Sequence, residues 1–157
     1  MLDDDDRVRL IKQKAVALLA VRERSRFILR NKLKEKFFEL EDLPIIDACL
    51  DELEGKGYLS DERFARASLV TKASRFGDQR LKWELRCQGV NSETINSVME
   101  EFEESEFERA KTLWERKFGE VPEDQKERAR QFRFLASRGF SFKTINQIIK
   151  GDWDDFD

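Results

Sequence analysis

The feature that most constrains this chain is an internal repeat with a period near 50 residues. Gly89 aligns with Gly139, and Thr94–Asn96 aligns with Thr144–Asn146, at an offset of 50. A weaker copy lies upstream, where apolar residues recur at offsets of 49 and 52. A period of this length combined with helical hydrophobic spacing indicates a unit of several helices that stacks on its neighbours.

Chain breakers divide each repeat into three helical segments. Only seven Gly and two Pro interrupt the 157 residues, which favours long helices with one buried stripe each. We predict an all-α fold of three tandem three-helix repeats in an elongated, curved array. The predicted divisions are repeat one at 1–57 with an acidic tip at 1–6, repeat two at 58–104, repeat three at 105–150, and an acidic aromatic tail at 151–157.

Local signals predict where several helices begin and end. Ser105 followed three residues later by Glu108 matches a capping box that would open repeat three. The apolar spacing predicts a first helix over 7–21, and helices of repeat two over 61–75 and 92–104.

The residue inventory excludes several kinds of chemistry. There is no His, and the two Cys cannot form a structural zinc site or a disulfide scaffold. Phosphate-binding glycine loops and a nucleophile elbow are absent from the sequence. We therefore predict a protein that is not an enzyme and has no catalytic residues, metal or cofactor. The acidic start and the lack of a long apolar run predict a cytoplasmic protein without a membrane partner.

Charge is segregated along the chain although its net value is only −3. Residues 7–38 carry eleven basic and two acidic side chains, whereas residues 91–108 carry seven Glu and no basic residue. Basic blocks recur with the repeats, so we consider binding to an anionic partner beside the alternative of solvated helix faces. The candidate partner-binding residues are Arg22, Arg24, Arg26, Arg30, Lys32, Lys34, Arg75, Arg80, Lys82, Arg86, Arg130, Arg133, Arg138 and Lys143.

Aromatic residues lie between these basic residues, a pattern also typical of platforms that stack unpaired bases. Most of them belong to apolar stripes and are predicted to be core residues, as is Cys49; the aromatic residues of this group are Phe64, Phe102, Phe107 and Phe132. Trp83 and Phe134 lie far around their helices from those stripes. We expect these two side chains to pack between repeats, with contact to a partner as the alternative.

Four runs of the sequence resemble the RecX-type family of regulatory proteins. These runs are 15–33, 57–65, 84–90 and 135–141, and their order and spacing cover nearly the whole chain. One departure is Ile28, where the family tends to have an acidic residue.

The resemblance implies an inhibitor of the RecA recombinase. Such proteins bind in the groove of RecA–single-stranded DNA filaments and oppose filament growth, ATP hydrolysis, strand exchange and co-protease activity. The alternative hypothesis is a helical module that binds single-stranded nucleic acid directly. The isoelectric point near 5.3 argues against that alternative, whereas the segregated charge favours it. Weak contact with single- or double-stranded DNA is compatible with both hypotheses, and we expect a monomer.

Overall fold

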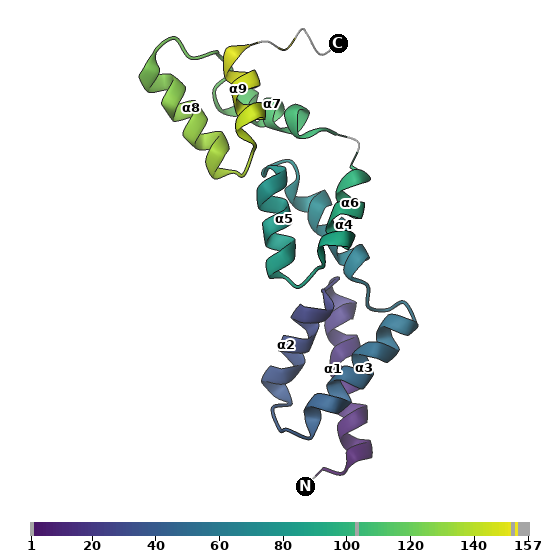
Figure 1. Cartoon of the computed structure of the whole chain (residues 1–157). Helices are drawn as coiled ribbons and strands as arrows, with labels where there is room; N and C mark the ends of the chain where they lie inside the picture. Colours follow the sequence, from purple (N-terminus) through teal and green to yellow (C-terminus); the bar gives the residue numbers. More distant parts are fainter. Residues whose placement is uncertain (1, 103, 152, 154–157) are drawn as a thin grey trace. The chain divides into compact units, whose positions relative to one another are not determined.

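The computed structural model describes residues 2–102, 104–151 and 153, and these contain nine α-helices and no other regular element (Figure 1). The helices are α1 (Asp4–Val21), α2 (Arg26–Lys36), α3 (Asp42–Gly55), α4 (Asp61–Lys72), α5 (Asp78–Cys87), α6 (Ser92–Glu100), α7 (Glu106–Lys117), α8 (Gln125–Ser137) and α9 (Phe142–Lys150). The predicted all-α class is confirmed.

The chain forms two compact units that divide the second predicted repeat. Unit one comprises residues 1–67 and 85–98, and unit two comprises 68–84 and 99–157. The numerical boundaries of the three repeats stay predictions.

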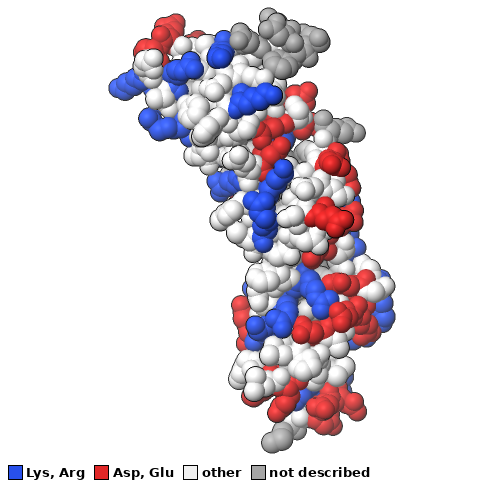
Figure 2. Space-filling view, in the orientation of Figure 1, with Lys and Arg blue, Asp and Glu red and all other residues white. Residues whose placement is uncertain are grey.

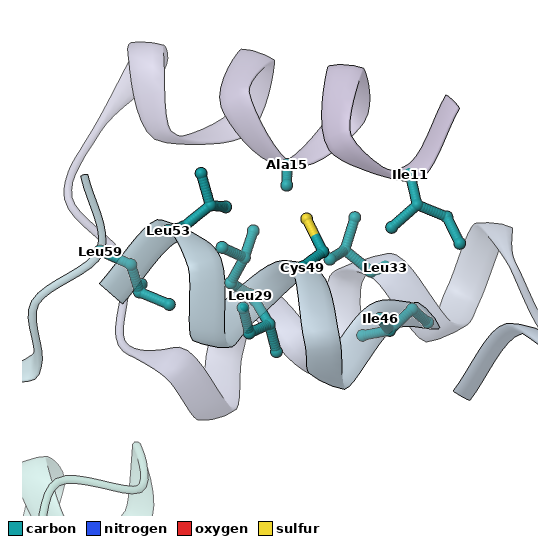
Figure 3. Packing of buried hydrophobic residues seen from close by; sticks show 9 residues of the cluster. Ile11, Ala15, Leu29, Leu33, Ile46, Cys49, Leu53 and Leu59 are labelled. Carbon is teal, nitrogen blue, oxygen red and sulfur yellow. The ribbon is translucent and has the colours of Figure 1, made fainter. Parts of the chain in front are cut away.

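In unit one, α1, α2 and α3 enclose a common apolar core. Ile11 and Ala15 of α1 point toward Leu29 and Leu33 of α2, and Cys49 lies among them from α3 (Figure 3). The four apolar side chains around Cys49 are inaccessible to solvent, so this helical triplet has its own core. The predicted core position of Cys49 is confirmed.

In unit two, α7, α8 and α9 form a second triplet with its own core. Trp114 of α7 packs with Leu135 of α8 and Ile145 of α9. The buried indole N–H of Trp114 donates a hydrogen bond to Oε1 of Gln131 at 2.8 Å. A buried polar atom without such a partner would cost free energy, so this bond makes both side chains compatible with the core.

Side-chain caps explain where several helices begin. Ser105 accepts a hydrogen bond from the Glu108 N–H while the Glu108 carboxylate accepts one from the Ser105 N–H, which confirms the predicted capping box. The first helix begins at Asp4, earlier than predicted, because Asp3 caps the N–H of Asp6. Carboxylates are favourable at this position since they oppose the positive end of the helix dipole.

Two predicted helix ends were wrong. α4 ends at Lys72 and not at residue 75, because the carbonyls that follow it are bound by a side chain from α7. α6 ends at Glu100 and not at residue 104. The excess of Glu after Met99 places negative charge at the negative end of the helix dipole, which disfavours extension of the helix.

Candidate binding surface

A close approach of two glycines joins α5 to the turn after α8 in unit two. The Gly77 N–H donates a hydrogen bond to the Arg138 carbonyl oxygen at 2.8 Å. A Cβ atom added to Gly77 would lie 2.4 Å from the backbone of Gly139, and one added to Gly139 would lie 2.4 Å from Cβ of Arg80. Only glycine at both positions allows this separation, which brings Arg80 and Arg138 together.

Arg109 of α7 fixes the segment between α4 and α5. Its guanidinium is 4% exposed and donates hydrogen bonds to the carbonyl oxygens of Ala73 and Phe76, at 2.8 and 3.0 Å. It also pairs with the Asp78 carboxylate at 2.9 Å. A buried cation with this many partners is fully compensated, and it holds Phe76 at the start of α5.

Glu106 links the N-terminal ends of two other helices, at the first residue of α5 and at the N-cap of α9. Its two carboxylate oxygens accept hydrogen bonds from the N–H groups of Asp78 at 2.9 Å and Ser141 at 3.0 Å. Burial alone would raise the pKa of Glu106, but these backbone hydrogen bonds outweigh it and hold the pKa below its ordinary value. Glu106 therefore carries a negative charge where the starts of α5 and α9 meet α7. We call this set of contacts, together with the contact between Gly77 and the turn after α8, the joint.

Three guanidinium groups surround the Phe76 ring that this joint positions. The guanidinium carbons of Arg80, Arg75 and Arg138 lie 4.1, 5.3 and 5.8 Å from the ring centroid. Arginine on an aromatic face gains electrostatic attraction to the ring and loses little of its side-chain hydration. The structure thus brings together predicted site residues from two different repeats.

Further pairs of cations and rings extend this cluster over α7 and α8. Arg138 also lies 5.1 Å from the Phe134 ring, Lys117 lies 5.3 Å from the same ring, and Arg130 lies 5.2 Å from the Phe118 ring. We call this surface the cation–aromatic stripe; it consists of Arg75, Phe76, Arg80, Lys117, Phe118, Arg130, Phe134 and Arg138.

Carboxylates neutralise only part of the stripe. Arg80 pairs with Glu84 at 3.3 Å, and Arg130 pairs with Glu127 at 3.1 Å. Within the described part of the chain, no carboxylate pairs with the other three cations, which are Arg75, Lys117 and Arg138. The stripe therefore presents positive charge to its surroundings.

The predicted cations of α2 lie in a different electrostatic setting. Arg26 pairs with Asp51 and Glu54 of α3 at 2.7 and 2.9 Å, and Arg30 pairs with Asp47 at 2.7 Å. The hydrogen bond from Arg30 holds the pKa of Asp47 below its ordinary value. Basic and acidic side chains adjoin one another over α2 and α3 in Figure 2. These arginines are thus paired within the chain.

The remaining predicted residues are not part of the stripe. Arg24 donates to the Leu18 carbonyl oxygen at 3.2 Å. The others form no ion pair with any side chain in the described ranges; they are Arg22, Lys32, Lys34, Lys82, Arg86, Arg133 and Lys143. Figure 2 shows basic side chains over α5 and α8 with few acidic neighbours.

Sequence reasoning missed three members of the stripe, namely Phe76, Lys117 and Phe118. Their signal is a basic residue, a Phe and a Gly in succession, which occurs at 75–77 and again at 117–119. In both places the Phe follows the end of a helix, so its ring stands beside cations from a neighbouring element.

Of the two aromatic residues expected between repeats, neither packs there. Trp83 is 59% exposed, and no hydrogen bond or ring contact joins it to another described residue. Phe134 packs inside the α7–α9 triplet, where its ring meets Phe118 edge to face at 5.5 Å. Helix spacing does not identify what lies opposite a side chain, so it could not predict that Phe134 meets Phe118 of its own triplet.

The described residues contain no group of acidic or thiol side chains that could hold a metal ion. None of their helices is long and apolar enough to cross a membrane. The geometry instead suits contact with an anionic surface, because stacked guanidinium groups are held in place while their hydrogen-bonding edges stay available. The fold defines the class, a helical-repeat protein, and its surface carries the cation–aromatic stripe.

Comparison with known proteins identifies the family. Residues 60–99 match the second three-helix domain of RecX and residues 103–149 match the third. The chain is 40% identical to regulatory protein RecX of Ralstonia nicotianae over 90% of this chain and 87% of that protein. It is also 40% identical to the RecX of Chromobacterium violaceum over 92% of each chain. The chain belongs to the RecX family of regulatory proteins, which confirms both the resemblance and the prediction that it is not an enzyme.

Solved structures agree on the fold. A crystal structure of regulatory protein RecX gives a TM-score of 0.76 at 22% identity, covering 96% of this chain and 80% of that one. The structure of RecX from Lactobacillus salivarius gives 0.76 at 18% identity, covering 94% and 97%. The three-helix repeat fold predicted from the sequence is confirmed by these matches.

Proposed function

We propose that this protein is a negative regulator of the RecA recombinase that binds, as a monomer, in the groove of RecA–single-stranded DNA filaments. Binding there inhibits filament growth, and with it ATP hydrolysis, strand exchange and co-protease activity. Membership of the RecX family supports regulation of RecA. The observation that carries the surface assignment is the cation–aromatic stripe, where three cations lack a carboxylate partner among the described residues.

The stripe suits a filament groove because its charge is fixed rather than diffuse. Arg75 and Arg138 are held beside one ring, so less side-chain entropy is lost when they meet phosphates or carboxylates. Arg26 and Arg30 contribute less to such contact, because each would have to leave an acidic partner on α3.

The test is DNA-dependent ATP hydrolysis by preformed RecA filaments, titrated with the protein. The wild type is expected to lower hydrolysis at amounts well below those that coat the DNA. The Arg75→Gln/Arg138→Gln double variant is expected to require at least about tenfold more protein, since each lost ionic contact costs about 1 kcal/mol or more. Arg116→Gln is the matched control, because Arg116 is an exposed arginine outside the stripe. Equal inhibition by the double variant and the control would refute the assignment of the stripe.

Direct contact with single-stranded DNA is a second candidate function, favoured by the alternation of cations and rings in the stripe. A direct contact requires binding to DNA without RecA, with an affinity that falls as salt rises. Loss of hydrolysis only when the DNA is saturated would favour this function over filament inhibition.

A further inference from the structure

We propose that Trp83 is a stacking site for an unpaired nucleobase. This inference rests on the direct strand contact that we propose as the second function, and it does not require inhibition of RecA. It begins from the surface of α5, where a large aromatic side chain is exposed beside cations.

Trp83 differs from the other two tryptophans of the chain. Trp114 is buried, and Trp153 packs on it edge to face with a centroid distance of 5.1 Å while its N–H donates to the Ile148 carbonyl oxygen. Trp83 has neither kind of contact with a described residue and is 59% exposed. Leaving an indole in water forgoes a large gain from apolar burial, so its place on the surface favours a role in binding.

The charge around Trp83 favours an anionic partner over a basic or neutral apolar one. Lys82 precedes it and forms no ion pair with a described residue, and Arg80 lies one helical turn before it. The adjacent carboxylate, Glu84, is occupied by Lys72 at 3.0 Å and by Arg80 at 3.3 Å. The immediate surroundings of the indole are therefore cationic, as in proteins that stack single-stranded bases.

Trp83 lies beside the stripe, so the phosphates of a bound strand could contact the stripe while one of its bases contacts the indole. Residues three apart on a helix face the same side, so the indole lies next to Arg80, which contacts Phe76 at 4.1 Å. Phosphates that follow the stripe would bring one base within reach of the indole face. Every base has an aromatic face, so the contact is expected to tolerate any sequence.

The experiment measures binding of a labelled oligothymidylate to the full chain, without RecA, across a series of salt concentrations. Trp83→Ala is expected to weaken binding by about 5- to 150-fold, the range found when an aromatic residue that stacks on one base is removed. The slope of log affinity against log salt should not change, because no phosphate contact is lost. Arg138→Gln is expected to do the opposite and reduce the slope by about 0.7.

Two matched controls separate stacking from a general loss of surface. Phe38→Ala removes an aromatic side chain that is 77% exposed but is followed by Glu39, and it is expected to leave binding unchanged. Trp83→Phe keeps an aromatic face and should restore most of the affinity. A strand of the same length without bases should bind the wild type more weakly, and this loss should be smaller for Trp83→Ala, because base and indole act as a pair.

Three outcomes would overturn the inference. The first is equal affinity of Trp83→Ala and Phe38→Ala, and the second is an equal loss by Trp83→Ala on strands with and without bases. The third is weakened RecA inhibition with unchanged DNA binding, which would assign Trp83 to a protein contact. If no variant binds the strand, direct DNA contact is also rejected, whereas the RecA proposal is judged separately by ATP hydrolysis.

Discussion

Substitution of Gly77 by alanine tests how the binding surface is built. The added Cβ would lie 2.4 Å from three backbone atoms, namely the carbonyl carbon and oxygen of Gly139 and the nitrogen of Phe140. Backbone atoms cannot rotate away as a flexible side chain can, so the turn after α8 has to move by about 1 Å to reach ordinary contact.

The expected loss of stability follows from three contributions. Overpacking of this kind costs about 1–3 kcal/mol, and the hydrogen bond from Gly77 N–H to the Arg138 carbonyl, now 2.8 Å long, contributes about 1 kcal/mol. The lower entropy of alanine in the unfolded chain offsets about 0.5 kcal/mol. Gly77→Ala is therefore expected to lower the free energy of unfolding by about 1.5–3.5 kcal/mol.

The assay is urea denaturation followed by circular dichroism, with Gly55→Ala as the matched control. Gly55 is the last residue of α3, and a Cβ added there would meet nothing within 4 Å. Neither glycine has a positive φ, so the comparison isolates the steric contact from backbone strain. Gly55→Ala should leave stability unchanged or raise it by up to about 1 kcal/mol. Equal stability of the two variants would refute the close packing of Gly77 against Gly139.

Two further predictions concern the side chains that fix the same joint. Arg109→Met is expected to cost about 3 kcal/mol in urea denaturation, because the Ala73 and Phe76 carbonyls lose a buried donor, whereas Arg128→Met on the exposed face of α8 should cost almost nothing. Glu106 has a folded-state pKa below its ordinary value of 4.5, so its ionised form contributes stability above that pH, and the contribution is lost as the pH falls through the lower pKa. As the pH falls from about 5 to 3, Glu106→Gln should therefore lose less unfolding free energy than the wild type. An equal loss of unfolding free energy in the two proteins over this range would contradict the role of the carboxylate.

Features encoded within a few residues were predictable from the sequence. The capping box needs only Ser105 and Glu108 and was read correctly. The end of α4 was not predictable, because it depends on Arg109, which is 36 residues from Ala73. No local pattern reports that a guanidinium from another repeat will bind the carbonyls after a helix.

In the binding surface too, the residue types were evident from the sequence, whereas the contacts between residues far apart in the chain were not. The basic character of Arg75, Arg80 and Arg138 was evident, but their convergence on Phe76 depends on the contact between two glycines. The even spacing of Arg26 and Arg30 suggested an external partner. Their partners are instead acidic residues of α3, namely Asp51 for Arg26 and Asp47 for Arg30. These acidic residues are also four apart, so comparing the charge spacing of the two helices would have suggested the pairing.

The joint in unit two has a counterpart in unit one, which gives the sequence repeat a structural meaning. In unit one, Ser25 Oγ donates to the Gln88 carbonyl oxygen at 2.6 Å, and the Arg26 N–H donates to the Asp61 carboxylate at 2.7 Å. In unit two, Gly77 N–H donates to the Arg138 carbonyl and the Asp78 N–H to Glu106. In both units, the start of a second helix binds an acidic residue at the start of the next first helix.

The glycine that ends the following helix completes each joint, and this explains which side chains are presented there. A Cβ at Gly89 would lie 2.2 Å from Cβ of Phe27, and one at Gly139 would lie 2.4 Å from Cβ of Arg80. The glycine thus meets an aromatic residue in the first turn of α2 at one joint and a cation in the first turn of α5 at the other. Because these hydrogen bonds and the glycines hold each joint, the side chain opposite each glycine is free to differ between repeats. The repeated sequence preserves the joint, and the variation within it places Phe76, Arg80 and Arg138 of the stripe at the joint in unit two.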